Sequence, residues 1–206
     1  RTKFIIQNMK RSVNFEQFFT KEDLAKKCVD FTLEHIKNIQ NIIEPSAGGG
    51  VFLKFLPKNT ISMDILPLND QIKKQDFLKY SPQLIGKTLV IGNPPFGARA
   101  SLARKFILHS AKFADVIAFI LPRSFNKSTF QKFFPKNYHL INWFLCEDFE
   151  TPSGVPVKIK CVFQIWEKRD TERYIQDTVY DTDDFILKHA HFSQKTSSEI
   201  EYFKSK

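Results

Sequence analysis

The sequence predicts an α/β fold in which a mostly parallel sheet is covered by helices on both faces. Three observations support this prediction. Strand-like and helical stretches alternate at short intervals along most of the 206 residues, as they do in doubly wound sheets. Five of the seven glycines lie in two short loops, at positions 48–50 and at 92 and 97. Polar residues follow several predicted strands, and ligands of such sheets bind beyond the carboxyl ends of the strands.

The first predicted helix begins after Thr20, and its buried face carries Leu24, Cys28 and Phe31 at helical spacing. Thr20 and Asp23 resemble the pair of side chains that caps a helix start. Residues 39–44 form a predicted strand, which leads into the three consecutive glycines. A helix start is predicted at 51–56, and Pro57 ends it.

The remaining elements follow in quick succession. Strands are predicted at 60–65, 74–77, 88–91 and 116–121, and two late strands at 140–146 and 161–166. Helices are predicted at 100–113 and 128–134. We expect one domain over residues 1–169 and a polar extension over residues 170–206.

Composition restricts the partners and the location. With 31 Lys and Arg against 22 Asp and Glu, the net charge of +9 favours anionic partners such as nucleic acid. No apolar run approaches the roughly 20 residues that a membrane helix needs. The three cysteines lack the close spacing of zinc sites and redox motifs, which predicts no metal and an intracellular location, in cytoplasm or nucleus.

The loop that follows the first strand begins with Glu44 and contains the three glycines at 48–50. It is not a P-loop, because no Gly-Lys-Ser/Thr follows, and it is not the G-x-G-x-x-G of dinucleotide enzymes. A dehydrogenase-like function is therefore excluded. The glycines allow the backbone to approach a ligand closely, and Glu44 could meet an ammonium group.

Two aspartates follow the next two strands. Asp64 ends the second strand, 20 residues beyond Glu44, where an acidic side chain accepts hydrogen bonds from ribose hydroxyls. Asp76 follows the third strand and could accept from an adenine amino group while Phe77 packs on the ring. Each aspartate alone also fits a turn or a helix cap. Their positions at successive strand ends together favour a nucleoside site.

The residues 92–97, Gly-Asn-Pro-Pro-Phe-Gly, form the sharper signal. Proline supplies no N–H, so we expect the backbone carbonyls of Asn93 and Pro94 to lack local donors. The Asn93 side-chain oxygen adds a third acceptor. This array suits an amino group with two hydrogens to donate, and Phe96 could stack on a flat ring. The alternative is a plain proline turn with Phe96 in the core.

As a set, these motifs resemble those of class I S-adenosylmethionine-dependent amino-methyltransferases, a group that includes the adenine-N6 DNA methyltransferases of restriction–modification systems. The resemblance extends over roughly residues 15–125 and rests on 17–20, 44–53, Asp64, 76–77 and 93–96. It implies a Rossmann-like sheet of seven strands whose last strand is antiparallel. The segments 140–146 and 161–166 would then form a hairpin.

The resemblance also implies a cofactor, S-adenosyl-L-methionine, and a role for each matching residue. The implied cofactor-binding residues are Phe19, Thr20, Glu44, Pro45, Ser46, Ala47, Gly48, Gly50, Asp64, Ile65, Asp76 and Phe77. The implied catalytic residues are Asn93, Pro94, Pro95 and Phe96. Acceptors at Asn93 and Pro94 would free the lone pair of an aromatic amine, while the cofactor carries the reactive methyl group.

The implied substrate is an exocyclic amino nitrogen of a nucleic-acid base, most of all adenine N6 in DNA or RNA. Such a base must be flipped out or single-stranded. Arg99, Arg123 and Lys127 are the expected nucleic-acid contacts, whereas Arg104 and Lys105 are expected on a solvated face. Only about 40 residues follow Trp166, so a partner subunit or a missing domain could recognise the target. A protein glutamine methyltransferase and a non-catalytic methyltransferase-like subunit are the alternatives.

Overall fold

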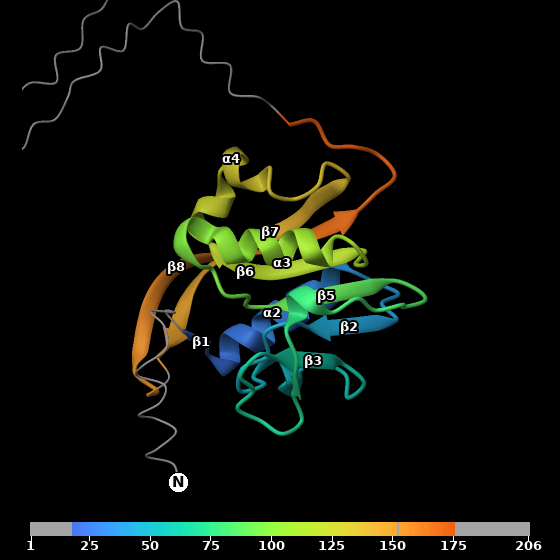
Figure 1. The fold of residues 1–206 in the computed structure, drawn as a ribbon. Coiled ribbons are helices and arrows are strands. Elements are labelled where there is room, and N and C mark those ends of the chain that lie inside the picture. The colour runs from blue at the N-terminus through green and yellow to red at the C-terminus, as the bar shows by residue number, and fades with distance from the viewer. Residues whose placement is uncertain (1–17, 152, 176–206) are drawn as a thin grey trace, which may run out of the picture. The chain divides into compact units, whose positions relative to one another are not determined.

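The computed structural model describes residues 18–151 and 153–175. Residue 17 of the predicted N-terminal motif, Pro152 and residues 176–206 of the predicted extension lie outside the described residues. The described residues build one sheet of eight strands, in the order β1-β7-β8-β6-β5-β2-β3-β4 (Figure 1). The strands are β1 (Phe19–Thr20), β2 (Asn41–Glu44), β3 (Ile61–Asp64), β4 (Lys73–Lys74), β5 (Thr88–Gly92), β6 (Val116–Pro122), β7 (Tyr138–Glu150) and β8 (Pro156–Lys168).

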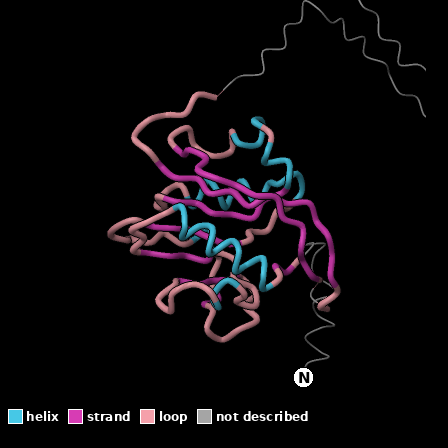
Figure 2. Tube along the Cα trace, turned by 180° about the vertical axis from the view of Figure 1, so that it is seen from behind, coloured by secondary structure: helices cyan, strands magenta, loops and turns pink. Residues whose placement is uncertain are grey.

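Helices cover both faces of the sheet, as the sequence predicts. Helix α2 (Glu22–His35) packs on one face, while α3 (Ser101–Ser110) and α4 (Ser128–Gln131) lie on the other, as the front and rear views show (Figures 1 and 2). Four short 3-10 helices complete the described elements: η1 (Phe52–Lys54), η2 (Phe77–Lys79), η3 (Ala98–Ala100) and η4 (Arg123–Asn126). The predicted helix at 51–56 is therefore only a 3-10 turn.

The central strands are apolar because both of their faces are covered. All residues of β5 are buried, and so is β6 from Val116 to Leu121, which is typical of parallel strands between two helical layers. Strand β2 pairs in parallel with β3 on one side and with β5 on the other. The strand order therefore reverses between β2 and β5, and doubly wound sheets bind their ligands at such a switch point.

The last strand is antiparallel, as expected. Strand β8 pairs with β6 from Val116↔Glu167 to Pro122↔Cys161, and β7 pairs with β8 over most of its length. Both strands of this hairpin are longer than the predicted 140–146 and 161–166. Residues 156–160 of β8 extend beyond the end of β6, and the far half of the hairpin curves away from the sheet (Figure 1).

The described residues form eight strands where seven were predicted, and the additional strand is β1. Strand β1 pairs with the far end of β7, through Phe19↔Glu150 and Thr20↔Phe149. The expectation that Thr20 caps α2 is wrong for the same reason. The N-cap residue is Lys21, whose side chain forms no capping hydrogen bond, and Thr20 is held in the strand instead.

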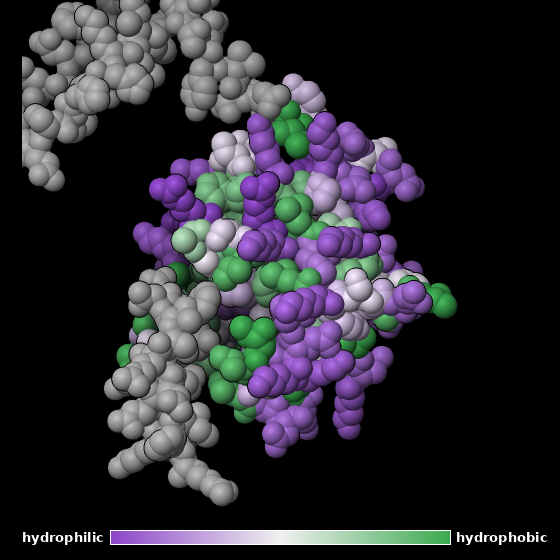
Figure 3. Space-filling view, viewed as in Figure 1, coloured by the Kyte–Doolittle hydropathy of each residue, from purple (hydrophilic) through white to green (hydrophobic). Residues whose placement is uncertain are grey.

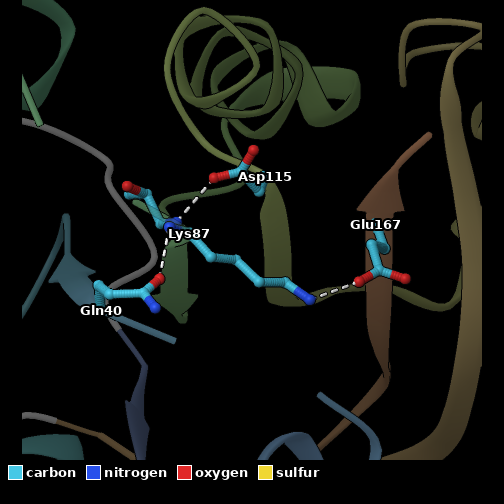
Figure 4. A network of polar contacts seen from close by, with 5 residues as sticks. Gln40, Lys87, Asp115 and Glu167 are labelled. Carbon is cyan, nitrogen blue, oxygen red and sulfur yellow. Dashed lines mark hydrogen bonds and ion pairs between the residues drawn. The ribbon is translucent and has the colours of Figure 1, made fainter. Parts of the chain in front are cut away.

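A polar network connects residues at the amino ends of the central strands, the edge of the sheet opposite to their carboxyl ends (Figure 4). The backbone N–H of Lys87 donates to Gln40 Oε1 at 2.6 Å, and the Lys87 ammonium lies 2.7 Å from Glu167 Oε1. Asp115 accepts from the backbone N–H of Thr88 at 2.8 Å. These contacts tie the start of β5 to the segments before β2 and β6 and to β8. Within residues 18–151 and 153–175, no helix is long and apolar enough to cross a bilayer.

Candidate functional site

Three of the predicted strand-end segments meet at the carboxyl edge of the sheet. The backbone N–H of Gly48 in the loop after β2 donates to Asp64 Oδ2 at the end of β3, at 2.8 Å. The Ser46 hydroxyl donates to the backbone carbonyl of Asn93, which directly follows β5, at 3.1 Å. The convergence expected from the order of strands is therefore confirmed for these segments.

Asp64 organises the glycine loop. Its second carboxylate oxygen accepts from the backbone N–H of Leu66 at 2.8 Å, so each oxygen holds one loop and keeps further lone pairs for a ligand. Gly48 lies in the left-handed region with φ 52°, and a Cβ there would stand 3.5 Å from the Phe19 ring. Phe19 thus lies over the loop, while Ile65, next to Asp64, is 59% exposed.

Glu44 is a buried carboxyl group, and one of its oxygens has no donor among the described residues. Only 1% of the residue is exposed, and its Oε2 has no hydrogen-bond partner among the described residues. Burial, together with the smaller effect of the negative charge of Asp64, raises the pKa of Glu44 to about 8. A buried carboxylate is costly unless a cation or a donor pairs with it. Glu44 is therefore suited to bind a cationic group.

Asn93 presents a second buried acceptor. Its side-chain nitrogen donates to Thr20 Oγ1 at 3.1 Å, and its Oδ1 has no partner within the described part of the chain. The expectation that its backbone carbonyl is also free is wrong, because Ser46 donates to it. No described residue donates to the Pro94 carbonyl. Two acceptors of the expected array thus remain available.

The turn that carries Asn93 is anchored to α3. Pro94 is buried, Pro95 is exposed and Phe96 is half-buried against the core beneath α2. The carbonyl of Phe96 accepts from the backbone N–H groups of Leu102 and Ala103, at 3.0 and 3.2 Å. Residues 93–97, called the acceptor turn below, and the first turn of α3 therefore form one connected unit.

Asp76 and Phe77, the residues expected to contact adenine, make contacts within the protein instead. Asp76 Oδ1 accepts from the backbone N–H of Leu78 at 3.0 Å and so caps η2. Phe77 is 1% exposed and stacks on Phe106 of α3, with 5.1 Å between the ring centroids. The expected stacking face is absent, because η2 turns this ring into the core. Asp76 remains half exposed and keeps its second oxygen near Lys79, at 3.8 Å.

The basic residues expected to contact nucleic acid lie on the surface. Arg99 follows β5 by seven residues, Arg123 directly follows β6, and Lys127 lies at the end of η4; all three are exposed. The structure brings none of them into contact with Asn93. Within the described ranges, no group of three His, Cys, Asp or Glu side chains could hold a metal ion.

Sequence reasoning missed two features of the site. The contact between Thr20 and Asn93 joins residues 73 positions apart, and no local pattern marks such a pair. Arg104 and Lys105 are exposed, as expected, but the sequence did not indicate that they line a hollow beside the acceptor turn together with Arg99. Their grouping in sequence with Arg99, at spacings of five and six residues, was the available signal.

No protein-family model matches the sequence, and no curated protein matches it. Among solved structures, it is similar to a Pyrococcus horikoshii protein described as an RNA methyltransferase, with 17% identity, a TM-score of 0.57, and coverage of 82% of this chain and 99% of that one. A Thermoplasma acidophilum protein matches with 14% identity and a TM-score of 0.50, over 69% and 83% of the two chains.

A third similar structure is the methyltransferase subunit of a type I restriction–modification system from Streptococcus thermophilus. The identity is 16% and the TM-score 0.50, and the match covers 82% of this chain and 48% of that subunit. These likenesses show the fold: the chain has the Rossmann-like α/β architecture of class I methyltransferases.

Proposed function

We propose that this chain transfers a methyl group from S-adenosyl-L-methionine to an exocyclic amino nitrogen of a nucleic-acid base, with adenine N6 preferred. One observation carries the proposal. Glu44 Oε2 and Asn93 Oδ1 are buried acceptors without described partners, and they belong to the segments that end β2 and β5. Each unpaired buried acceptor costs about 1–3 kcal/mol, so their presence at the ends of two neighbouring strands supports two ligands, a cofactor that donates to Glu44 and a substrate that donates to Asn93.

The residues around Glu44 fit the cofactor. Glu44 matches an ammonium group, and the free lone pairs of Asp64 match ribose hydroxyls. Gly48 and Gly50 have φ of 52° and 84°, so side chains there would be strained, and the loop leaves its backbone open to a ligand. When bound, the sulfonium supplies an electrophilic methyl group.

The residues around Asn93 fit the amino group that accepts the methyl. Asn93 Oδ1 and the Pro94 carbonyl would accept its two hydrogens, which withdraws the nitrogen lone pair from conjugation with the ring and directs it outward. Thr20 holds the amide of Asn93, and Ser46 holds its backbone. The protein's contribution is then alignment and preorganised hydrogen bonding.

Charge supports a polynucleotide as the substrate. The net charge is +9, and the exposed Arg99 and Arg123 follow strands whose carboxyl ends form the same edge as Asn93. Of the similar structures, one is described as acting on RNA and one belongs to a restriction–modification system. We infer that a partner subunit or further domain selects the target, and that the protein works in cytoplasm or nucleus, where its three buried cysteines stay free thiols.

Methyl transfer from tritiated S-adenosylmethionine to separate pools of DNA, RNA and protein tests the proposal. We expect label in a nucleic-acid pool and N6-methyladenosine, or its deoxy form, by mass analysis of the digested nucleosides. Asn93→Ala serves as the matched inactive control. Label in protein glutamine, or calorimetry that detects no cofactor binding, would refute the proposal.

A further inference from the structure

A basic hollow lies beside the acceptor turn, on the face of the sheet that α3 covers. It has a volume of about 480 Å³, within the range of roughly 300–1,000 Å³ typical of ligand sites. Arg99, Arg104 and Lys105 line it together with the apolar side chains of Leu108 and Phe133, and no acidic residue of the described part of the chain does. Figure 3 shows hydrophilic and apolar side chains interspersed over α3 on this face.

The three cations of the hollow are not neutralised by the described residues. None of them forms an ion pair with a carboxylate within residues 18–151 and 153–175. The Arg104 guanidinium lies over the Phe133 ring, 4.9 Å from its centroid, and such cation–π contacts hold the group in place. Positive charge is thus concentrated beside the apolar Leu108 and Phe133, and no described carboxylate neutralises it.

The backbone leading into the hollow is strained. Arg99 and Ala100 have φ of 51° and 61°, and each non-glycine residue in this region costs about 1–3 kcal/mol. Such strain is concentrated at functional sites. Here it belongs to the short link between the acceptor turn and α3. The Phe96 carbonyl bonds to Leu102 and Ala103 in the first turn of α3, which also carries Arg104.

We propose that this hollow binds a phosphate group of the substrate strand, next to the nucleotide whose base reaches Asn93. The inference rests on the proposed function. In it, the hollow recognises the phosphodiester backbone of the nucleic acid. A guanidinium group can donate two parallel hydrogen bonds to phosphate oxygens. Arg99 and Arg104 would therefore donate to the phosphate, and Lys105 would add positive charge. Leu108 and Phe133 would contact the adjoining sugar or base.

The test compares two full-length double variants with the same loss of charge. Arg99→Gln/Arg104→Gln removes two cations of the hollow, and Lys58→Gln/Lys112→Gln removes two exposed lysines elsewhere. Binding of fluorescein-labelled, mixed-sequence 20-nucleotide strands, one DNA and one RNA, is measured by anisotropy over a series of salt concentrations. Each phosphate contact contributes about 0.7 to the slope of log K against log salt for single strands.

We expect the hollow variant to lower the magnitude of this slope by about 0.7 or more and the lysine control to leave it unchanged. Thermal unfolding by circular dichroism verifies that the variants fold, and Arg104→Gln alone replaces the double variant if it does not. Equal slopes for the hollow variant and wild type would overturn the inference while the proposed function stands. Wild-type protein that binds neither strand and methylates protein would overturn both. The DNA and RNA arms show which backbone is preferred.

Discussion

The side-chain amide of Asn93 donates to the hydroxyl of Thr20, with 3.1 Å between Nδ2 and Oγ1. Thr20 stands in β1, which is paired with the far end of β7 through Thr20↔Phe149. The long hairpin therefore positions Thr20, and Thr20 orients the amide of Asn93. With the nitrogen engaged by Thr20, Oδ1 has no hydrogen-bond partner among the described residues and is available as an acceptor.

Replacing Thr20 by valine keeps the shape of the side chain and removes the acceptor. A neutral hydrogen bond contributes about 1 kcal/mol, so we expect kcat for methyl transfer to fall roughly five- to tenfold. Thr20→Ser, which retains the hydroxyl, should stay within about twofold of wild type. Equal turnover for the valine and wild-type proteins would show that Thr20 does not orient Asn93.

Replacing Asn93 by alanine removes the acceptor for the amino group. We expect single-turnover methyl transfer to fall by about 10²-fold or more, as for other preorganised hydrogen-bonding groups, and the calorimetric Kd for S-adenosylmethionine to change little. Asn93→Asp keeps a side-chain oxygen in place and should retain more activity than alanine. Full turnover by the alanine variant would remove Asn93 from the proposed chemistry.

Asp64→Ala should weaken binding of S-adenosylmethionine by about 10- to 100-fold, since a hydrogen bond to a charged group contributes about 1.5–3 kcal/mol. Part of this loss reflects the glycine loop, because Gly48 and Leu66 lose their acceptor. Asp70→Ala is the matched control, as an exposed aspartate in the same connection between β3 and β4. Calorimetry that gives one affinity for both variants would contradict the ribose role of Asp64.

Glu44 should make the free protein less stable as the pH rises. The pKa is about 8 in the folded chain against an ordinary 4.5, so between these values the folded chain keeps a proton that the unfolded chain has released. The free energy of unfolding should therefore fall across this window, by at most about 1.4 kcal/mol per pH unit. Urea unfolding at pH 5 and pH 8 measures the change.

Glu44→Gln is the control for this pH effect, since a glutamine has nothing to titrate. Its stability relative to wild type should increase from pH 5 to pH 8. A constant difference between the two proteins would show that Glu44 does not hold its proton. In the wild type at pH 7, binding of a cationic ligand should release that proton, which calorimetry in two buffers detects.

Gly97→Ala should destabilise the acceptor turn. Gly97 has φ 68°, and a Cβ there would lie 2.9 Å from Leu102 Cγ and 3.1 Å from the Leu102 backbone nitrogen. We expect a loss of about 1–3 kcal/mol, or a fall in Tm of several degrees for a chain of this size. Gly49→Ala meets no atom within 4 Å, so an equal fall in that variant would contradict this account.

Several strands and site residues of this protein could be predicted from the sequence because local sequence patterns specify them. Apolar runs bounded by glycine and proline located β2, β3, β5 and β6. The rule that parallel strands end at one edge then placed Glu44, Asp64 and Asn93 together, as the hydrogen bonds among their segments confirm. The fold class and the antiparallel last strand were likewise predictable.

Only the tertiary structure decided the rest, because it depends on pairings between distant segments. The local sequence predicts that Thr20 caps a helix, yet Thr20 pairs with the end of β7 in a strand and hydrogen-bonds to Asn93. The local sequence predicts that Phe77 contacts a ligand, yet its ring is buried against α3. A residue's local pattern specifies its backbone preference, whereas the burial and partners of its side chain depend on which distant surface packs against it.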